Sequence, residues 1–191
     1  MQYKFYALLS RMRYIARWGL MRNSFPENVQ EHSHQVAVLA HALALIRRDV
    51  LGLEADPERC ATAALYHDAS EIFTGDLPTP IKYYNPEIKQ AYKQVERVSG
   101  EKLLAMLPEQ LRAGMAPYIF EDDPVSRDIV KAADKLSAHI KCIEELKAGN
   151  EEFASAARQT RSALVDMGLP ELDWFLEHCL DSFGKNLDEL E

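Results

Sequence analysis

Helical periodicity is the feature of this sequence that most limits the folds open to it. Apolar residues recur three and four positions apart along almost the whole chain, and no stretch shows the sustained apolar–polar alternation of a half-buried strand. The pattern therefore predicts an all-α fold. The first expected helix covers residues 3–22, and its apolar stripe consists of Phe5, Leu8, Leu9, Met12, Ile15, Ala16 and Leu20.

Start and stop signals divide the rest of the chain into further helices. Asn28 and Glu31 have the spacing of a capping box, which predicts a helix from residue 28 to about residue 51. Asp56-Pro57 places a capping side chain before a proline at the first helical position, so the next helix is expected over residues 57–73. Later helices are expected over 86–107, 108–116, 124–148, 151–167 and 170–190. No repeat or long linker interrupts the 191 residues, so a single domain over 1–191 is predicted.

The composition excludes several classes of protein. With 47% hydrophobic and 27% charged residues the chain is typical of a soluble globular protein, and no apolar run reaches the roughly 20 residues of a membrane span. A net charge of −8 disfavours a nucleic-acid partner. Three scattered cysteines and the absence of a signal-peptide pattern indicate a reducing compartment, so we expect a cytoplasmic protein without a membrane partner.

Residues 1–22 depart from this acidic average, because they contain five basic and no acidic side chains. Three interpretations remain open at this point. The basic residues form a solvated helix face, they bind a membrane surface, or they concentrate positive charge for an anionic ligand.

Three short motifs carry chemically active side chains. Glu31-His32-Ser33-His34 opens the second helix, His67-Asp68 ends an apolar helix, and Asp134 is the one charged residue on a helix face shared with positions 130, 133, 137 and 140. Taken alone, a histidine on an apolar helix is more typical of a satisfied core residue, and Asp134 is more typical of a buried ion pair. Together, two imidazoles and two carboxylates suit a divalent first-row metal that keeps open positions for water and substrate. The other histidines, His34, His41, His139 and His178, are interpreted as structural or exposed.

Longer strings resemble one protein family. The order His, His-Asp, Asp is that of the HD-domain metal phosphohydrolases, and the chain resembles their bacterial 5′-deoxynucleotidases of the YfbR type in four strings. These strings are Arg17-Trp18, Glu31-His32-Ser33, Tyr66-His67-Asp68-Ala69-Ser70-Glu71 and Thr74-Gly75-Asp76-Leu77-Pro78-Thr79-Pro80. The resemblance implies a single HD-domain bundle of orthogonally packed helices that hydrolyses deoxyribonucleoside 5′-monophosphates. His34 departs from the family pattern, but it lies on a different helix face from His32 and is not expected to disturb the site.

The resemblance also implies roles for individual residues. One divalent ion would be held by His32, His67, Asp68 and Asp134, with Co²⁺ the most active and Mn²⁺, Zn²⁺ or others accepted. Arg17 would orient the phosphate and Trp18 would contact the sugar. The substrate would further be lined by Asp68, Asp76, Leu77, Pro78, Thr79 and Asp134. A homodimer is expected on the same grounds.

The expected reaction is in-line attack of metal-bound water on the phosphorus atom. Glu71 is the candidate general base or water-positioning group, Asp76 the candidate for assisting the leaving O5′, and these two roles could be exchanged. Packing of Trp18 against C2′ would reject ribonucleotides, and no base-reading motif is evident, so breadth across the bases is expected. Two alternatives remain: an HD hydrolase of cyclic nucleotides, deoxynucleoside triphosphates or guanosine tetraphosphate, or a sensor that binds metal and nucleotide without catalysis.

Overall fold

A computed structural model describes residues 2–78, 81 and 84–191 of the chain. Across these residues every regular element is a helix, and a lone β-bridge joins Ala16 to Asn28. The expectation of an all-α fold is therefore confirmed. No helix in the described ranges is both long and apolar enough to cross a lipid bilayer.

The N-terminal half contains α1 (Phe5–Leu9), η1 (Ser10–Tyr14), α2 (Val29–Leu45), the π-helical turn η2 (Ile46–Val50), α3 (Pro57–Tyr66) and the short α4 (Glu71–Thr74). The C-terminal half contains α6 (Pro86–Ala105), α7 (Glu109–Ile119), α8 (Pro124–Lys147), η3 (Glu151–Phe153), α9 (Ala154–Val165), α10 (Pro170–His178), η4 (Leu180–Gly184) and η5 (Leu187–Glu189).

Two of the predicted helix starts are confirmed atom by atom. Asn28 Oδ1 accepts hydrogen bonds from the backbone N–H groups of Gln30 and Glu31, both at 3.1 Å, and Glu31 Oε2 accepts from Asn28 N at 3.3 Å. This reciprocal capping box fixes the first turn of α2. Asp56 likewise caps α3 by accepting from Arg59 N at 2.9 Å. Both starts matter for the site, because α2 and α3 carry its histidines.

The predicted helix over residues 3–22 is wrong beyond Tyr14. Ile15 is extended, and Val29 N donates to Ile15 O at 3.0 Å while Arg17 N donates to Glu27 O at 2.9 Å. The last member of the supposed stripe, Leu20, is 83% exposed. Pairing with a segment 12 residues away replaces the helical hydrogen bonds here, so the residues after Ile15 form a loop.

Two further helices are shorter than predicted. The 57–73 helix is interrupted by turns over residues 67–70, and only α4 continues it. The 170–190 helix ends at His178 and is followed by the two 3₁₀ turns η4 and η5. Because of the turns over residues 67–70, His67 and Asp68 lie at the end of α3 and not within a continuous helix.

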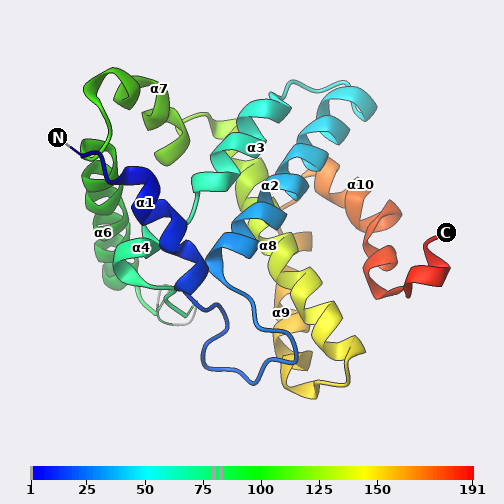
Figure 1. Ribbon diagram of the computed structural model, residues 1–191. Coiled ribbons are helices and arrows are strands. Elements are labelled where there is room, and N and C mark those ends of the chain that lie inside the picture. The colour runs from blue at the N-terminus through cyan, green and yellow to red at the C-terminus, as the bar shows by residue number, and fades with distance from the viewer. Residues whose placement is uncertain (1, 79–80, 82–83) are drawn as a thin grey trace.

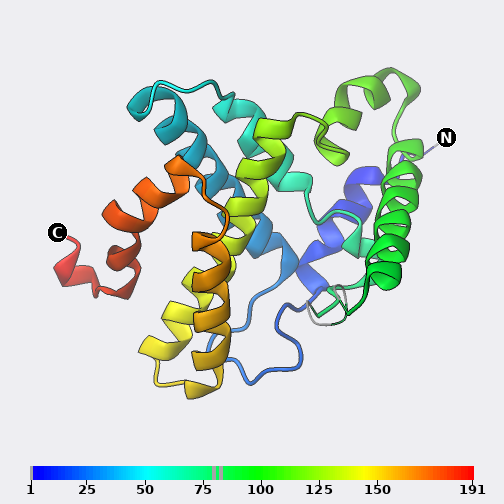
Figure 2. The same ribbon diagram turned by 180° about the vertical axis from the view of Figure 1, so that it is seen from behind.

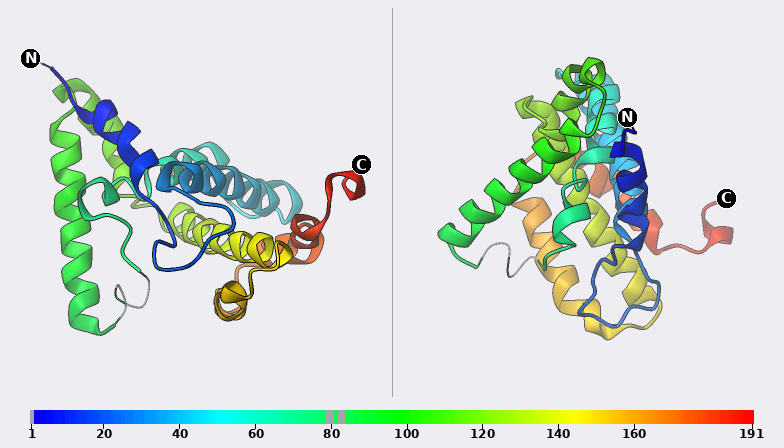
Figure 3. Two further views of the ribbon diagram at one scale, coloured as in Figure 1. Left: turned by 60° about the horizontal axis from the view of Figure 1, so that its bottom comes forward. Right: turned by 60° about the vertical axis from the view of Figure 1, so that its left-hand side comes forward.

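The main core lies between α2, α3 and α8, with α10 closing one side (Figure 1). Leu43, Leu136 and Ile140 are fully buried there. Figure 2 shows α9 lying along α8 on the face opposite to α2. A second cluster, formed by Phe5, Ala69, Leu103 and Leu107, joins α1 and the turn after α3 to the end of α6. The rest of α6 stands across one end of the bundle (Figure 3).

Candidate active site

Four potential metal ligands converge from three helices. His32 lies in the first turns of α2, His67 and Asp68 follow the end of α3, and Asp134 lies in the middle of α8. His32 Nε2 is 3.0 Å from Asp134 Oδ1 and 3.6 Å from Asp68 Oδ2. His67 Nε2 is 3.2 Å from Asp68 Oδ2 and 4.0 Å from Asp134 Oδ1. The two imidazole ring centres are 5.3 Å apart, so both rings can bind one ion.

The second nitrogen of each imidazole orients the ring. Ser137 Oγ donates to Gln35 Oε1 at 2.8 Å, so at 3.2 Å it accepts the proton of His32 Nδ1. His67 Nδ1 donates to the carbonyl oxygen of Ala64 at 2.7 Å. Both bonds keep Nδ1 protonated and direct Nε2 toward the carboxylates, where a metal ion can take the place of the Nε2 proton, the arrangement found behind metal-binding histidines. Gln35 and Ser137 are a supporting pair that the sequence reasoning missed.

The Nε2 atoms of both imidazoles and the two carboxylates share the inner face of this cluster. The buried Nε2 of His67 has no hydrogen-bond partner among the described residues. Two ring nitrogens thus face two carboxylates at 3 to 4 Å, an arrangement that needs a positive charge between them, either a proton on a ring nitrogen or a metal ion in its place. A ligand atom from each of His32, His67 and Asp68 lies within 4.8 Å of the other two. The donor set of nitrogen and oxygen without thiolate fits a divalent first-row metal.

The pKa shifts reflect the same attraction for a cation. Burial would lower the pKa of His67, but the carboxylates of Asp68 and Asp134 outweigh it and raise that pKa to about 9. Burial would raise the pKa of Asp134, but the hydrogen bond and charge of His32 lower it to about 2. His67 does the same for Asp68, whose pKa is held well below its usual range. Both carboxylates are therefore ionised at neutral pH.

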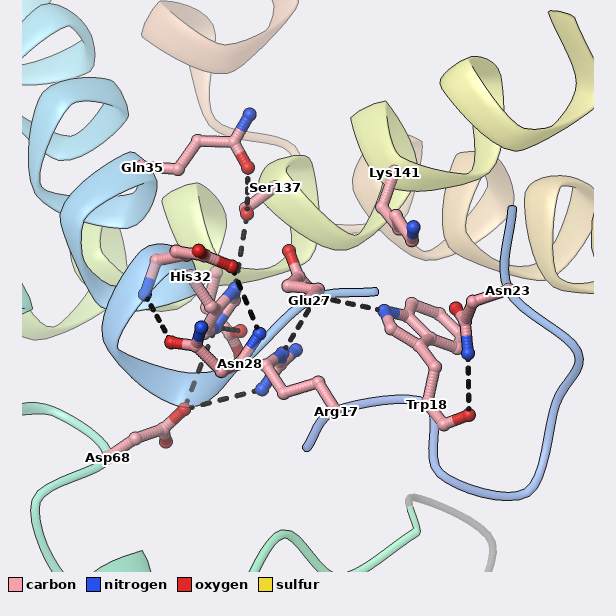
Figure 4. A network of polar contacts seen from close by, with 12 residues as sticks. Arg17, Trp18, Asn23, Glu27, Asn28, His32, Gln35, Asp68, Ser137 and Lys141 are labelled. Carbon is pink, nitrogen blue, oxygen red and sulfur yellow. Dashed lines mark hydrogen bonds and ion pairs between the residues drawn. The ribbon is translucent and has the colours of Figure 1, made fainter. Parts of the chain in front are cut away.

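Arg17 lies at the edge of this cluster. Its Nη1 donates to Asp68 Oδ2 at 3.4 Å and its Nε donates to Glu27 Oε2 at 3.2 Å (Figure 4). Burial would lower the pKa of Arg17, but the surrounding carboxylates, including that of Asp76, raise it. A permanent cation thus lies beside the ligand cluster, where an anion could contact it and a bound ion together.

Trp18 follows Arg17 in an unusual backbone conformation. Its φ of 56° makes it the one non-glycine residue with positive φ in the described chain. The indole Nε1 donates to Glu27 Oε2 at 3.1 Å, and the ring packs against Phe153 with centres 5.3 Å apart. A bulky residue held in the left-handed region costs of order 1–3 kcal/mol, which the surrounding contacts must offset.

The remaining predicted residues lie in the segment after α3. Glu71 is buried at the start of α4, and its N–H donates to Asp68 O at 3.0 Å. Asp76 follows Gly75 and is half-buried, close enough for its charge to raise the pKa of Arg17. Leu77 and Pro78 are half-buried in the same loop, whereas the predicted substrate residue Thr79 lies outside the described residues.

The four histidines assigned no chemical role lie apart from the cluster. His34 is exposed and His41 is half-buried on α2. His139 bonds through Nδ1 to Thr160 Oγ1 at 2.9 Å, and His178 stacks on Trp174 with ring centres 4.3 Å apart. Their structural or surface interpretation is consistent with these contacts.

The chain matches known proteins along nearly its full length. The family model of the YfbR-like 5′-deoxynucleotidases matches residues 4–183. A 5′-deoxynucleotidase of Vibrio parahaemolyticus is 50% identical over 188 residues, which cover 97% of each chain. The 5′-deoxynucleotidase YfbR of Shigella boydii is 48% identical over 191 residues, covering 99% of this chain and 96% of that protein.

Solved structures share the fold at lower identity. An HD-domain phosphohydrolase from Listeria innocua superposes with a TM-score of 0.82 at 22% identity, over 94% of this chain and 88% of that one. The HD phosphohydrolase of cyanophage S-2L, solved with dA and one catalytic Zn²⁺ ion, superposes with a TM-score of 0.64 at 21% identity, over 95% and 99% of the two chains.

Proposed function

The chain belongs to the YfbR-like 5′-deoxynucleotidase family, and we propose that it hydrolyses deoxyribonucleoside 5′-monophosphates in line, using one divalent ion held by His32, His67, Asp68 and Asp134. The observation that carries the proposal is the convergence of two imidazoles and two ionised carboxylates from α2, the end of α3 and α8. When bound there, a divalent ion supplies a water of lowered pKa and polarises a phosphate oxygen. The donor set accommodates Co²⁺, Mn²⁺ and Zn²⁺, and we propose Co²⁺ as the most active of these.

Arg17 is proposed to orient the phosphate. Two of its N–H groups are used by Glu27 and Asp68, which fix the plane of the guanidinium and leave its remaining donors for phosphate oxygens. Arg17 contacts Asp68, one of the proposed metal ligands. A phosphate bound to Arg17 would therefore lie next to the metal site and close to the carboxylates of Asp68 and Asp134.

Glu71 and Asp76 are proposed to move the protons. Glu71 is buried one turn after Asp68, where a carboxylate can accept the proton of the attacking water. Asp76 is half-buried and lies near Arg17, where it can assist the departing O5′. The loop that continues from Asp76 through Leu77, Pro78 and Thr79 is proposed to line the nucleoside.

Trp18 is proposed to reject ribose. It is adjacent to Arg17, so an indole there lies next to the sugar of a nucleotide whose phosphate is bound by the guanidinium. A hydrophobic wall discriminates against one added hydroxyl by about a hundredfold. No base-reading side chain is assigned, and we propose activity on all the common bases.

A homodimer is part of the proposal. Three apolar residues of α6, Ile88, Val95 and Val98, are exposed at spacings of seven and three, which places them on one helix face. A second copy of the chain on this face would bury a stripe that is costly to leave in water.

The proposal is tested by phosphate release from purified protein that has been stripped of metal and reloaded with Co²⁺, Mn²⁺ or Zn²⁺. We expect turnover of dAMP, slower turnover of AMP, and little of dATP or a cyclic nucleotide. His32→Ala should lower dAMP turnover at least about a hundredfold, since even residues that only support a ligand cost up to that factor. His34 is an exposed histidine on the same helix, so His34→Ala is the matched control and should leave dAMP turnover unchanged. Preference for dATP or a cyclic nucleotide, or no turnover at all, would overturn the proposal.

A further inference from the structure

A carboxylate that the sequence motifs do not include lies between the two residues proposed to read the phosphate and the sugar. Glu27 Oε2 accepts from Arg17 Nε at 3.2 Å and from Trp18 Nε1 at 3.1 Å (Figure 4). The side chains of Arg17 and Glu27 are each only 12% exposed. One oxygen atom therefore fixes a guanidinium and an indole at the same time.

The backbone reinforces this arrangement. Arg17 N donates to Glu27 O at 2.9 Å, so the two residues are joined through main chain and side chain alike. Trp18 depends on such outside support, because its φ of 56° lies in the left-handed region that a bulky side chain avoids. Phe153 bounds the indole on one side, and the hydrogen bond from Nε1 to Glu27 fixes the rotation of the ring.

We propose that Glu27 is a positioning residue that couples phosphate binding to sugar discrimination, through the one oxygen shared by Arg17 and Trp18. The inference rests on the proposed function, since it assigns the phosphate to Arg17 and the sugar to Trp18. A phosphate that holds Arg17 in place also holds Glu27, and Glu27 in turn holds the indole against the sugar. Discrimination against the 2′-hydroxyl is thus strongest when the phosphate is correctly bound.

If one oxygen must accept from both Arg17 and Trp18, the length of the side chain at residue 27 matters more than its charge. Glu27→Gln keeps an oxygen at the same distance from the backbone and can accept both hydrogen bonds, but it lacks the negative charge. Glu27→Asp keeps the charge and is shorter by one methylene, so a single oxygen no longer reaches both donors. Both variants are conservative and are expected to fold.

The test compares kcat/KM for dAMP and AMP in the two variants. We expect Glu27→Gln to keep the dAMP-to-AMP ratio within about twofold of the wild type, and Glu27→Asp to lower the ratio about tenfold, a substantial part of what an apolar wall provides. Glu152→Ala is the matched control. It removes a carboxylate that binds Arg22 in the same loop without touching Arg17 or Trp18, and should leave the ratio unchanged.

Tryptophan fluorescence provides a readout that does not depend on turnover. In a Trp174→Phe background Trp18 is the remaining indole, and Glu27→Asp should increase its quenching by acrylamide, whereas Glu27→Gln should not. The opposite order of the two variants, or an equal loss of dAMP and AMP activity in Glu27→Asp, would overturn the inference. Trp18→Ala separates this inference from the proposed function: an unchanged ratio in Trp18→Ala would remove the proposed sugar contact itself.

Discussion

Glu145→Ala is expected to destabilise the protein far more than an ordinary glutamate substitution on a helix. Glu145 is fully buried, and Lys141 Nζ donates to its Oε1 at 2.5 Å as well as to the carbonyl oxygen of Phe25. The backbone N–H groups of Ser24 and Phe25 and the side-chain amide of Asn150 also donate to this carboxylate, at 2.8 to 3.1 Å. Removing the carboxylate leaves the buried ammonium of Lys141 with one neutral acceptor, the carbonyl oxygen of Phe25. The N–H groups of Ser24, Phe25 and Asn150 lose this acceptor as well.

The magnitude follows from the loss of one partner of a buried ion pair, which costs about 3–5 kcal/mol in the free energy of unfolding. For a chain of this length each kcal/mol lowers Tm by about 2–4 °C, so a decrease of roughly 6–20 °C is expected. Urea denaturation and calorimetry, each with metal added, measure both quantities. The same substitution releases the loop that precedes Glu27, so dAMP activity should fall as well.

Two control variants test whether the buried Lys141–Glu145 pair causes this loss of stability. Glu152→Ala removes an ion pair to Arg22, which is 92% exposed, and should leave the free energy of unfolding close to that of the wild type. The double variant Lys141→Met with Glu145→Gln removes both charges and should cost less than the sum of the single changes. A Glu145→Ala protein within about 1 kcal/mol of the wild type, or equal to Glu152→Ala, would show that this pair does not hold the loop.

Four further outcomes are expected. Burial would raise the pKa of Glu145, but Lys141 and the N–H donors hold that pKa well below 4.5. As pH falls below about 5, the unfolded state therefore binds more protons than the folded state, and stability is lost. Glu145→Gln should make the free energy of unfolding depend less on pH in this acid range. Removing metal with a chelator should lower Tm by about 5–10 °C relative to protein saturated at a hundred times Kd, and an unchanged Tm would argue against an ion bound to the folded chain. Trp18→Ala should bring the kcat/KM values for dAMP and AMP together by about tenfold or more, measured by phosphate release. Val95→Asp on α6 should yield monomers in light scattering, whereas Lys93→Asp, an exposed residue on roughly the opposite side of the same helix, should not.

The helices around the site were predictable because their signals are local. The capping box at Asn28 and the Asp56-Pro57 pair specify the starts of α2 and α3, and the placement of His32 and His67 follows from those starts. The ligand set was also accessible to motif comparison, since imidazole and carboxylate side chains at fixed spacing have few interpretations. The distances in the structure are consistent with that set.

The N-terminal segment was not predictable from its periodicity. Ile15 and Ala16 continue an apolar stripe, but their backbone pairs with residues 28 and 29, and no local signal indicates a partner that distant. Glu27, in a loop between proline and asparagine, is typical of a solvated side chain, and its burial depends on that same pairing. Lys141 and Glu145 have the spacing of an exposed helical ion pair, yet the loop before Glu27 covers them.

The left-handed backbone at Trp18 is held in place by contacts of its own side chain. Glycine at this position would relieve a left-handed conformation that costs of order 1–3 kcal/mol, but it would remove the packing against Phe153 and the hydrogen bond to Glu27. It would also delete the indole that is proposed to face the sugar. Residue 18 therefore combines a strained backbone with the side chain whose contacts offset the strain, and a substitution changes both at once.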